Sequence, residues 1–288
     1  MPLTALVLVL TAALLHAVWN IGAKKAGGDH HFVLMGALLI SLLWAPVGLW
    51  FALDQLPRWG RLEWALVAAS GLTHLLYFNV LLKGYREADL TVVYPVARGT
   101  GPLVASLAAI VVLGERPGWL GVAGVLAVTG GVFLVAGGTR IFTGRQPRVL
   151  AGLGWGALTG ILIAGYTVID GYAVKRLAIS PILVDYFGNL ARIPFMLPVT
   201  LRDPAGFARS LRRWWPHALV MAVVSPAAYV LVLYAVQVAP LSHVAPAREV
   251  SMLFAALLGG RLLGEADRGL RLAGAALMAA GVILLAWG

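Results

Sequence analysis

The sequence predicts an all-α integral membrane protein with ten transmembrane helices, arranged as two inverted five-helix repeats around a central cavity. Three observations support this fold class: an apolar composition, an internal repeat and the number of apolar segments. Of the 288 residues, 60% are hydrophobic and 12% are charged, and the mean hydropathy is +0.88. Soluble domains carry about 25% charged residues, so the lipid bilayer is the expected solvent of this chain.

The second half of the chain repeats the first at an offset of 150 positions. Equivalent pairs include Ala97-Arg98 with Ala247-Arg248, and Leu113-Gly114-Glu115 with Leu263-Gly264-Glu265. Over positions 97–136, the first copy shares 15 of 40 residues with the second without a gap. Internal repeats are typical of secondary transporters, in which the substrate site lies between the halves.

A transmembrane helix needs about 20 mostly apolar residues. Ten segments meet this requirement approximately, in the order 3–22, 32–52, 63–83, 89–112, 118–137, 151–173, 180–201, 217–237, 241–263 and 270–287. Five belong to a first repeat, residues 1–137, and five to a second, residues 151–288; residues 138–150 form the linker loop. Because five is odd, the second repeat enters the membrane with the opposite orientation, which relates the halves by a two-fold axis in the membrane plane.

The basic residues predict the orientation of these spans. Segment 3–22 is interpreted as a transmembrane helix rather than a secretory signal, because no basic residues precede its apolar run. Outside the spans, five Lys and Arg residues fall on the side of the termini and fourteen on the other side. The positive-inside rule then places both termini outside the cytoplasm of a multi-pass protein of the inner or plasma membrane. The net charge of +10 is attributed to this bias and not to a nucleic-acid partner.

Small and acidic residues suggest how the helices pack. Gly152, Gly156 and Gly160 recur at a spacing of four, and such a face lets a neighbouring helix approach closely. Glu115 and Glu265 follow the fourth and ninth spans, and each is expected to cap the helix that comes next. The sequence contains no cysteine, which excludes disulfides and thiol chemistry.

Two arginine residues occupy equivalent positions deep in the fourth and ninth spans. Ionisable groups inside a membrane are costly and mark functional sites by default, and the arginine fork suits a carboxylate or phosphate. Arg98 and Arg248 are therefore candidates for a clamp on an acidic group, with Tyr94 one turn before Arg98. The alternative is a network of ion pairs between these arginines and the acids within the spans. Those acids are Asp170, Asp185 and Glu249.

A polar stripe on the first span has a counterpart on the sixth. His16, Trp19 and Asn20 lie together, and the repeat matches His16 with Tyr166 and Asn20 with Asp170. We interpret His16, Trp19, Asn20 and Tyr166 as cavity-lining substrate residues, although hydrogen bonds that only join helices would explain them as well. Burial favours the neutral form of a carboxyl group, so Asp170, together with Glu249, is the candidate proton carrier.

The paired motifs resemble those of a known family. Two copies of a five-span unit, each with Ala-Arg, then Leu-Gly-Glu, then a span rich in Gly and Ala, resemble the EamA family of the drug/metabolite transporter superfamily. The stretch His16-Ala17-Val18-Trp19-Asn20 is also similar to some uncharacterised members. The resemblance implies ten helices around a central cavity and proton-coupled or exchange transport by alternating access.

The superfamily also suggests a role for the arginines. In related phosphate-sugar exchangers, basic residues on the fourth and ninth helices hold the anion, and Arg98 and Arg248 fall on those helices. Small multidrug members instead rely on a glutamate in the first helix, where this chain has Asn20. The resemblance therefore favours an anion over a drug cation.

From these features we expect a secondary active transporter, an exporter or exchanger, of a small polar metabolite that carries an acidic group. An amino acid, a carboxylate or a phosphonate-like solute would fit. The alternatives are an efflux transporter of organic cations or drugs, a lipid-head-group flippase, and a non-transporting membrane protein. We expect no enzymatic activity, cofactor, metal or nucleic-acid partner. The expected partners are the substrate, the bilayer and protons, and a monomer can enclose the cavity.

Overall fold

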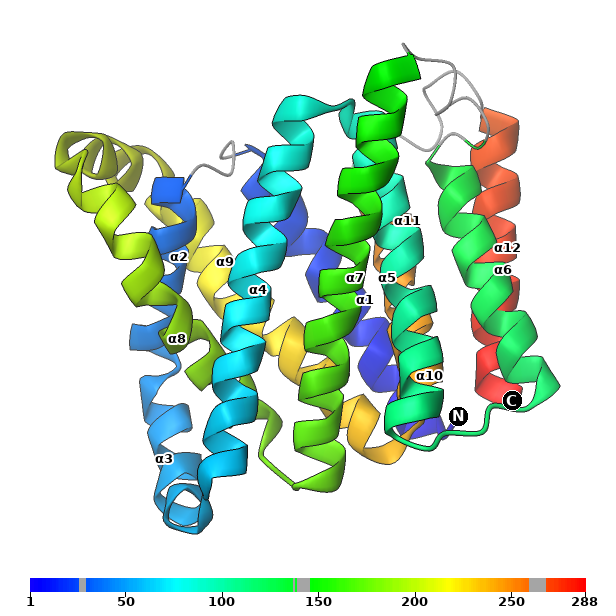
Figure 1. Cartoon of the computed structure of the whole chain (residues 1–288), viewed down its shortest axis with the longest axis horizontal. Coiled ribbons are helices and arrows are strands. Elements are labelled where there is room, and N and C mark those ends of the chain that lie inside the picture. The colour runs from blue at the N-terminus through cyan, green and yellow to red at the C-terminus, as the bar shows by residue number, and fades with distance from the viewer. Residues whose placement is uncertain (26–29, 137, 139–145, 259–267) are drawn as a thin grey trace.

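The computed structural model describes residues 1–25, 30–136, 138, 146–258 and 268–288, and every regular element in these ranges is helical (Figure 1). The α-helices are α1 (Leu3–Lys25), α2 (His30–Leu43), α3 (Ala45–Gln55), α4 (Arg61–Glu87), α5 (Leu90–Val112), α6 (Trp119–Val135), α7 (Gln146–Arg176), α8 (Pro181–Leu201), α9 (Pro204–Val238), α10 (Leu241–Ala247), α11 (Ser251–Leu258) and α12 (Arg268–Trp287). Short 3-10 turns cover Leu56–Arg58 and Arg248–Val250.

Several of these helices have the length and composition of membrane spans. Six are long and apolar enough to cross a bilayer, namely α1, α4, α5, α7, α9 and α12. The bent pair of α2 and α3 makes a seventh if it is counted as one span, and α6 is a shorter apolar helix. The chain is thus a multi-pass membrane protein, while the count of ten spans and the inverted relation of the halves stay predictions.

The structure corrects several predicted boundaries. Segment 32–52 bends by 60° between α2 and α3, where a proline occupies the first turn of α3 and lacks the N–H that would continue the helix. Segment 241–263 divides into α10, the 3-10 turn and α11, and its residues 259–263 lie outside the described ranges. Helix α7 begins at Gln146, so the last five residues of the predicted linker are helical.

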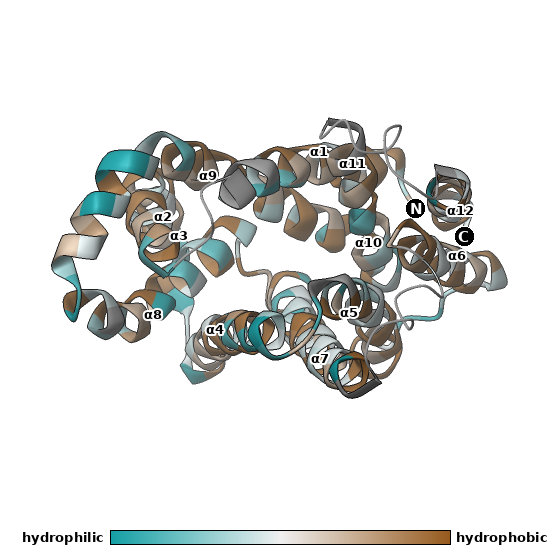
Figure 2. Cartoon of the chain, turned by 90° about the horizontal axis from the view of Figure 1, so that it is seen from above, coloured by the Kyte–Doolittle hydropathy of each residue, from teal (hydrophilic) through white to brown (hydrophobic). Residues whose placement is uncertain are grey.

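The two halves of the chain are interlocked rather than side by side. Helix α1 of the first half packs mainly against α9 and α11 of the second, while α7 of the second half packs mainly against α4 and α5 of the first. Viewed from above, α1 and α9 form one side of the molecule, and α4, α5 and α7 the other (Figure 2). Each half therefore contributes to both walls of the space between them.

The glycine stripe on α7 sets its distance from α5. A Cβ atom at Gly156 would lie 2.9 Å from the carbonyl oxygen of Val93, and one at Gly160 would lie 3.0 Å from that of Ala97. A Cβ atom at Gly152 would lie 2.9 Å from the side chain of Val92. The expected close approach is confirmed, and it fixes the position of α5 at the turn that carries Arg98.

A second pair of glycine faces joins α6 to α12. A Cβ at Gly131 would meet the carbonyl oxygen of Gly274 at 2.7 Å, and one at Gly274 would meet that of Gly131 at 2.8 Å. Gly124 and Gly281 face each other in the same reciprocal manner. Because Gly124 is the repeat equivalent of Gly274, this reciprocity is the pattern that an inverted repeat predicts at this contact.

We expect the Gly156→Ala substitution to destabilise the protein by about 1–3 kcal/mol, because the new Cβ would also lie 2.7 Å from the Cβ of Val96. The matched control is Gly154→Ala on the same helix, where nothing lies within 4 Å of the added atom. Thermal unfolding of the detergent-purified variants measures the difference. Equal melting temperatures for the two variants would contradict the role assigned to the stripe.

Candidate functional site

A cavity of about 320 Å³ lies between α1, α2, α4, α5, α7, α8 and α9, and Arg248 reaches it from the 3-10 turn. All seven predicted substrate residues line it: His16, Trp19, Asn20, Tyr94, Arg98, Tyr166 and Arg248. The structure thus brings these residues together, while their part in binding stays a prediction. Asp170 and Glu249, the predicted proton carriers, are buried behind the lining at 0% and 1% exposure.

An ion pair joins the two halves beside the cavity. The Nε of Arg98 on α5 lies 2.8 Å from a carboxylate oxygen of Glu249, and a terminal nitrogen of Arg98 donates to the Ser251 hydroxyl at 3.0 Å. From the sequence, both an anion clamp and an ion-pair network are possible for Arg98. In this structure, Arg98 belongs to an ion-pair network.

Arg248 shares the same carboxylate at a longer distance. Its Nε lies 3.8 Å from the second oxygen of Glu249, although adjacent residues of a regular α-helix point apart. The 3-10 turn over Arg248–Val250 interrupts the helix here and lets both side chains face the first half. Arg248 is 4% exposed, and its Nε has no hydrogen-bond partner among the described residues.

The charges of this group do not cancel. Two guanidinium groups meet one carboxylate, so the three side chains carry a net charge of +1. A buried charge without a partner is costly in a low-dielectric environment. An anionic group that enters the cavity can lower this cost by accepting hydrogen bonds from Arg248.

The polar stripe of α1 faces the cavity from another side. Asn20 donates its amide to the carbonyl oxygen of His16 at 2.7 Å, one helical turn away. The rings of His16 and Trp19 meet edge to face at 5.0 Å. The indole N–H of Trp19 is buried without a partner among the described residues, so it is a donor available to a ligand.

Asp170 contacts a side chain that lines the cavity. The hydroxyl of Tyr229 on α9 donates to the Asp170 carboxylate, and Tyr229 itself lines the cavity. Asp170 is fully buried on α7. The Tyr229 hydroxyl therefore lies between the cavity and this carboxyl group.

His74 lies on the cavity wall but is not among the site residues predicted from the sequence. Its ring stacks on that of Tyr166 at 3.8 Å, with 22° between the ring planes. Its Nδ1 lies 3.0 Å from the carbonyl oxygen of Ser70, which orients Nδ1–H toward its own helix. The available signal was a histidine inside the apolar third span.

Helix α8 supplies further polar groups to the cavity lining. Asn189 donates to the carbonyl oxygen of Ala37 at 3.0 Å, while Asp185 and Arg192 have no ion pair within 4 Å in the described part of the chain. Arg192 instead donates to the carbonyl oxygen of Gly188 on its own helix. These groups leave charged donors and acceptors on the wall opposite α5.

The family model described as the EamA-like transporter family matches residues 3–137 and 150–287. The chain belongs to this family. The two matches cover nearly the whole EamA-like chain and coincide with the two internal repeats, and members of the family are transporters rather than enzymes. The expected membership is thereby confirmed.

The fold of this EamA-like protein is shared with a solved structure. One structure, described only as a crystal structure of a protein, superposes with a TM-score of 0.73 at 18% identity and covers 98% of each chain. At this identity the likeness concerns the fold alone. No curated protein matches the sequence.

Proposed function

We propose that this EamA-like protein is a secondary active transporter of a small polar metabolite carrying an acidic group, and that it works as an exporter or exchanger by alternating access. An amino acid, a carboxylate or a phosphonate-like solute fits the proposal. The observation that carries it is the buried group of Arg98, Glu249 and Arg248 beside the cavity, with two guanidiniums for one carboxylate.

In this proposal Arg248 is the main contact of the acidic group. Arg98 lies 2.8 Å from Glu249 and also donates to Ser251, whereas the Nε of Arg248 lies 3.8 Å from the same carboxylate. A planar guanidinium offers paired donors that match a carboxylate or phosphate. Arg98 and Glu249 then position Arg248, and His16, Trp19, Asn20, Tyr94 and Tyr166 shape the rest of the cavity.

Proton coupling is assigned to Asp170. Glu249 is held between two guanidinium groups, so we give it the role of balancing charge and not of carrying the proton. Asp170 is buried next to a hydroxyl that reaches the cavity, which separates the proton site from the substrate site by the width of Tyr229. Protonation of Asp170 changes the charge beside the cavity by one unit and so affects the binding of an anion.

Transport of an organic cation is the second candidate, and one observation favours it. Asp185 lines the cavity without an ion pair within 4 Å among the described residues, and Tyr77 and Tyr229 line the same cavity. Carboxylates and aromatic faces both attract cations. The two candidates differ in the residue on which binding depends.

A ligand panel is expected to separate these candidates through Arg248→Gln. We expect anionic or zwitterionic solutes to raise the melting temperature of the wild type, because a ligand at 100 times its Kd stabilises a protein by about 2.7 kcal/mol. The panel contains amino acids, dicarboxylates, phosphonates and organic cations, and Arg248→Gln should remove the effect. The control is Arg58→Gln, since Arg58 is exposed and pairs with Asp54, four residues earlier in the chain.

Stabilisation by organic cations alone, unchanged in Arg248→Gln, would contradict binding of an acidic group. The binding charge would then belong to Asp185.

The Asp170→Asn substitution is expected to abolish the dependence of transport on an imposed pH gradient, because the amide cannot carry the proton. Exchange of substrate between two compartments of equal pH should continue. Transport by proteoliposomes at several pH gradients measures both quantities, with Asp54→Asn as an exposed control. An unchanged response of Asp170→Asn to the gradient would exclude the coupling role.

A further inference from the structure

The carboxylate of Glu115, a residue between α5 and α6, accepts its hydrogen bonds from groups of the second half. One oxygen accepts from Lys175 Nζ at 3.0 Å and from the N–H of Leu241 at 2.7 Å, and the other accepts from the N–H of Ser242 at 2.9 Å. We call these four residues the Glu115 junction. From the sequence, Glu115 is expected to cap α6, the next helix, but in the structure it caps α10, which begins 126 residues later.

Neighbouring contacts strengthen the same connection. Lys175 also donates to the carbonyl oxygen of Ala239 at 2.9 Å, Arg176 donates to that of Leu113, and the Ser106 hydroxyl donates to that of Ser242 at 3.0 Å. The bonds of Arg176 and Ser106 connect the two halves, whereas the bond from Lys175 to Ala239 lies within the second half.

The side chain of Glu115 is also ionised at neutral pH. Burial alone would raise the pKa of Glu115, but hydrogen bonds from Ser242, Leu241 and Lys175 outweigh burial and hold the pKa below its ordinary value. Its bonds are therefore charge-assisted, which makes them stronger than bonds between neutral groups.

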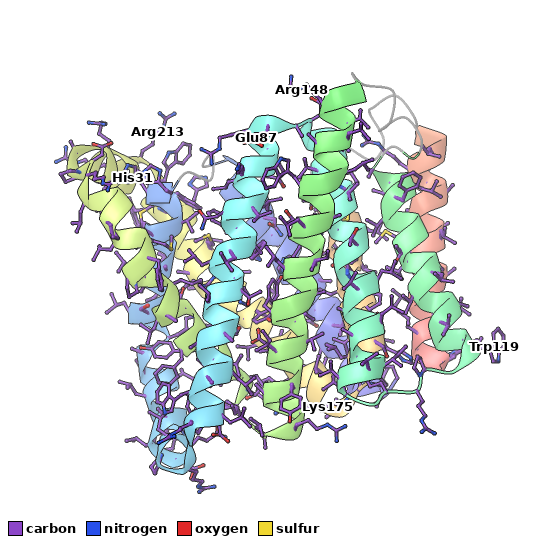
Figure 3. The ribbon with its side chains drawn as sticks, viewed as in Figure 1. His31, Glu87, Trp119, Arg148, Lys175 and Arg213 are labelled. Atoms are coloured by element: carbon purple, nitrogen blue, oxygen red, sulfur yellow. The ribbon has the colours of Figure 1, made fainter. Side chains whose placement is uncertain are left out.

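The junction lies at one end of the molecule, and the cavity lies toward the other. Lys175 is at the end opposite Arg148 and Glu87 (Figure 3). Along α7, the cavity residues Thr159 to Tyr166 precede the buried core residues Val168 to Val174, which are nearer Lys175. On α9 the cavity residues likewise precede the core residues, so packed side chains separate the cavity from the junction.

We propose that the Glu115 junction is a latch that keeps this end of the transporter closed, and that breaking it opens the cavity to this side. This inference rests on alternating access in the proposed function, but not on the identity of the substrate. The repeat equivalents of Lys175 and Glu115 are Lys25 and Glu265, and the structure does not describe the side chains of these two residues. The latch therefore rests on the described contacts alone.

The absence of native cysteine allows two single-cysteine reporters to test the latch. Val244→Cys places a thiol at a position of α10 with 0% exposure at the closed end, and Ser225→Cys places one on the cavity wall. Each reporter is combined with Glu115→Gln, which replaces the carboxylate by a neutral amide. The measurement is the rate of labelling by a hydrophilic maleimide in detergent micelles, without substrate.

We expect Glu115→Gln to increase the labelling rate at the Val244→Cys reporter about tenfold, and to decrease the rate at the Ser225→Cys reporter. Opposite changes indicate a shift between two conformations, whereas general loosening would increase both rates. The matched control is Asp54→Asn, an exposed carboxylate on α3 at the same end, which should change neither rate.

Unchanged rates in Glu115→Gln, or an increase at both reporters, would overturn the latch. If Glu115→Gln does not fold, Lys175→Gln is used instead. This variant keeps the two backbone donors to Glu115, so it should change the two labelling rates in the directions given for Glu115→Gln, but by a smaller factor. Since no substrate is present, a failure of the proposed anion binding would leave this result unaffected.

Discussion

The ion pair between Arg98 and Glu249 is the interaction on which the candidate site depends. It joins a helix of the first half to a 3-10 turn of the second, and Glu249 is 1% exposed. A buried carboxylate needs a partner, and Arg98 supplies it from α5, the helix that the glycine stripe of α7 packs against. The packing of small residues and the electrostatics of the cavity are thus parts of one arrangement.

Departures from the internal repeat create the chemistry of the cavity. Arg98 and Arg248 are equivalent positions, but Glu249 aligns with Gly99, so one carboxylate serves both arginines. In the same way, Asp170 aligns with Asn20, and the titratable carboxyl group lies in one half alone. A fully symmetric chain would carry no carboxylate or two at each of these places, and not the single one observed. Duplication explains the architecture, and the differences between the copies explain the proposed function.

Features that depend on composition and period could be predicted from the sequence. The apolar segments, the close approach at Gly156 and the seven cavity-lining residues follow from hydropathy, from spacing and from the cost of polar groups in lipid. The contacts of Glu115 with Leu241 and of Glu249 with Arg98 could not be predicted, because these partners lie more than 100 residues away and depend on how the halves interlock. His74 was missed because a single histidine has no pattern around it.

A double-mutant cycle at Arg98 and Glu249 tests the central claim most directly, with the free energy of unfolding in detergent as the readout. Arg98→Gln leaves Glu249 without its closest partner and should cost about 3–5 kcal/mol. The account predicts that the double variant with Glu249→Gln recovers a large part of this loss, which gives a coupling energy of up to about 3 kcal/mol. Strictly additive losses would contradict a cross-half ion pair as the basis of the cavity.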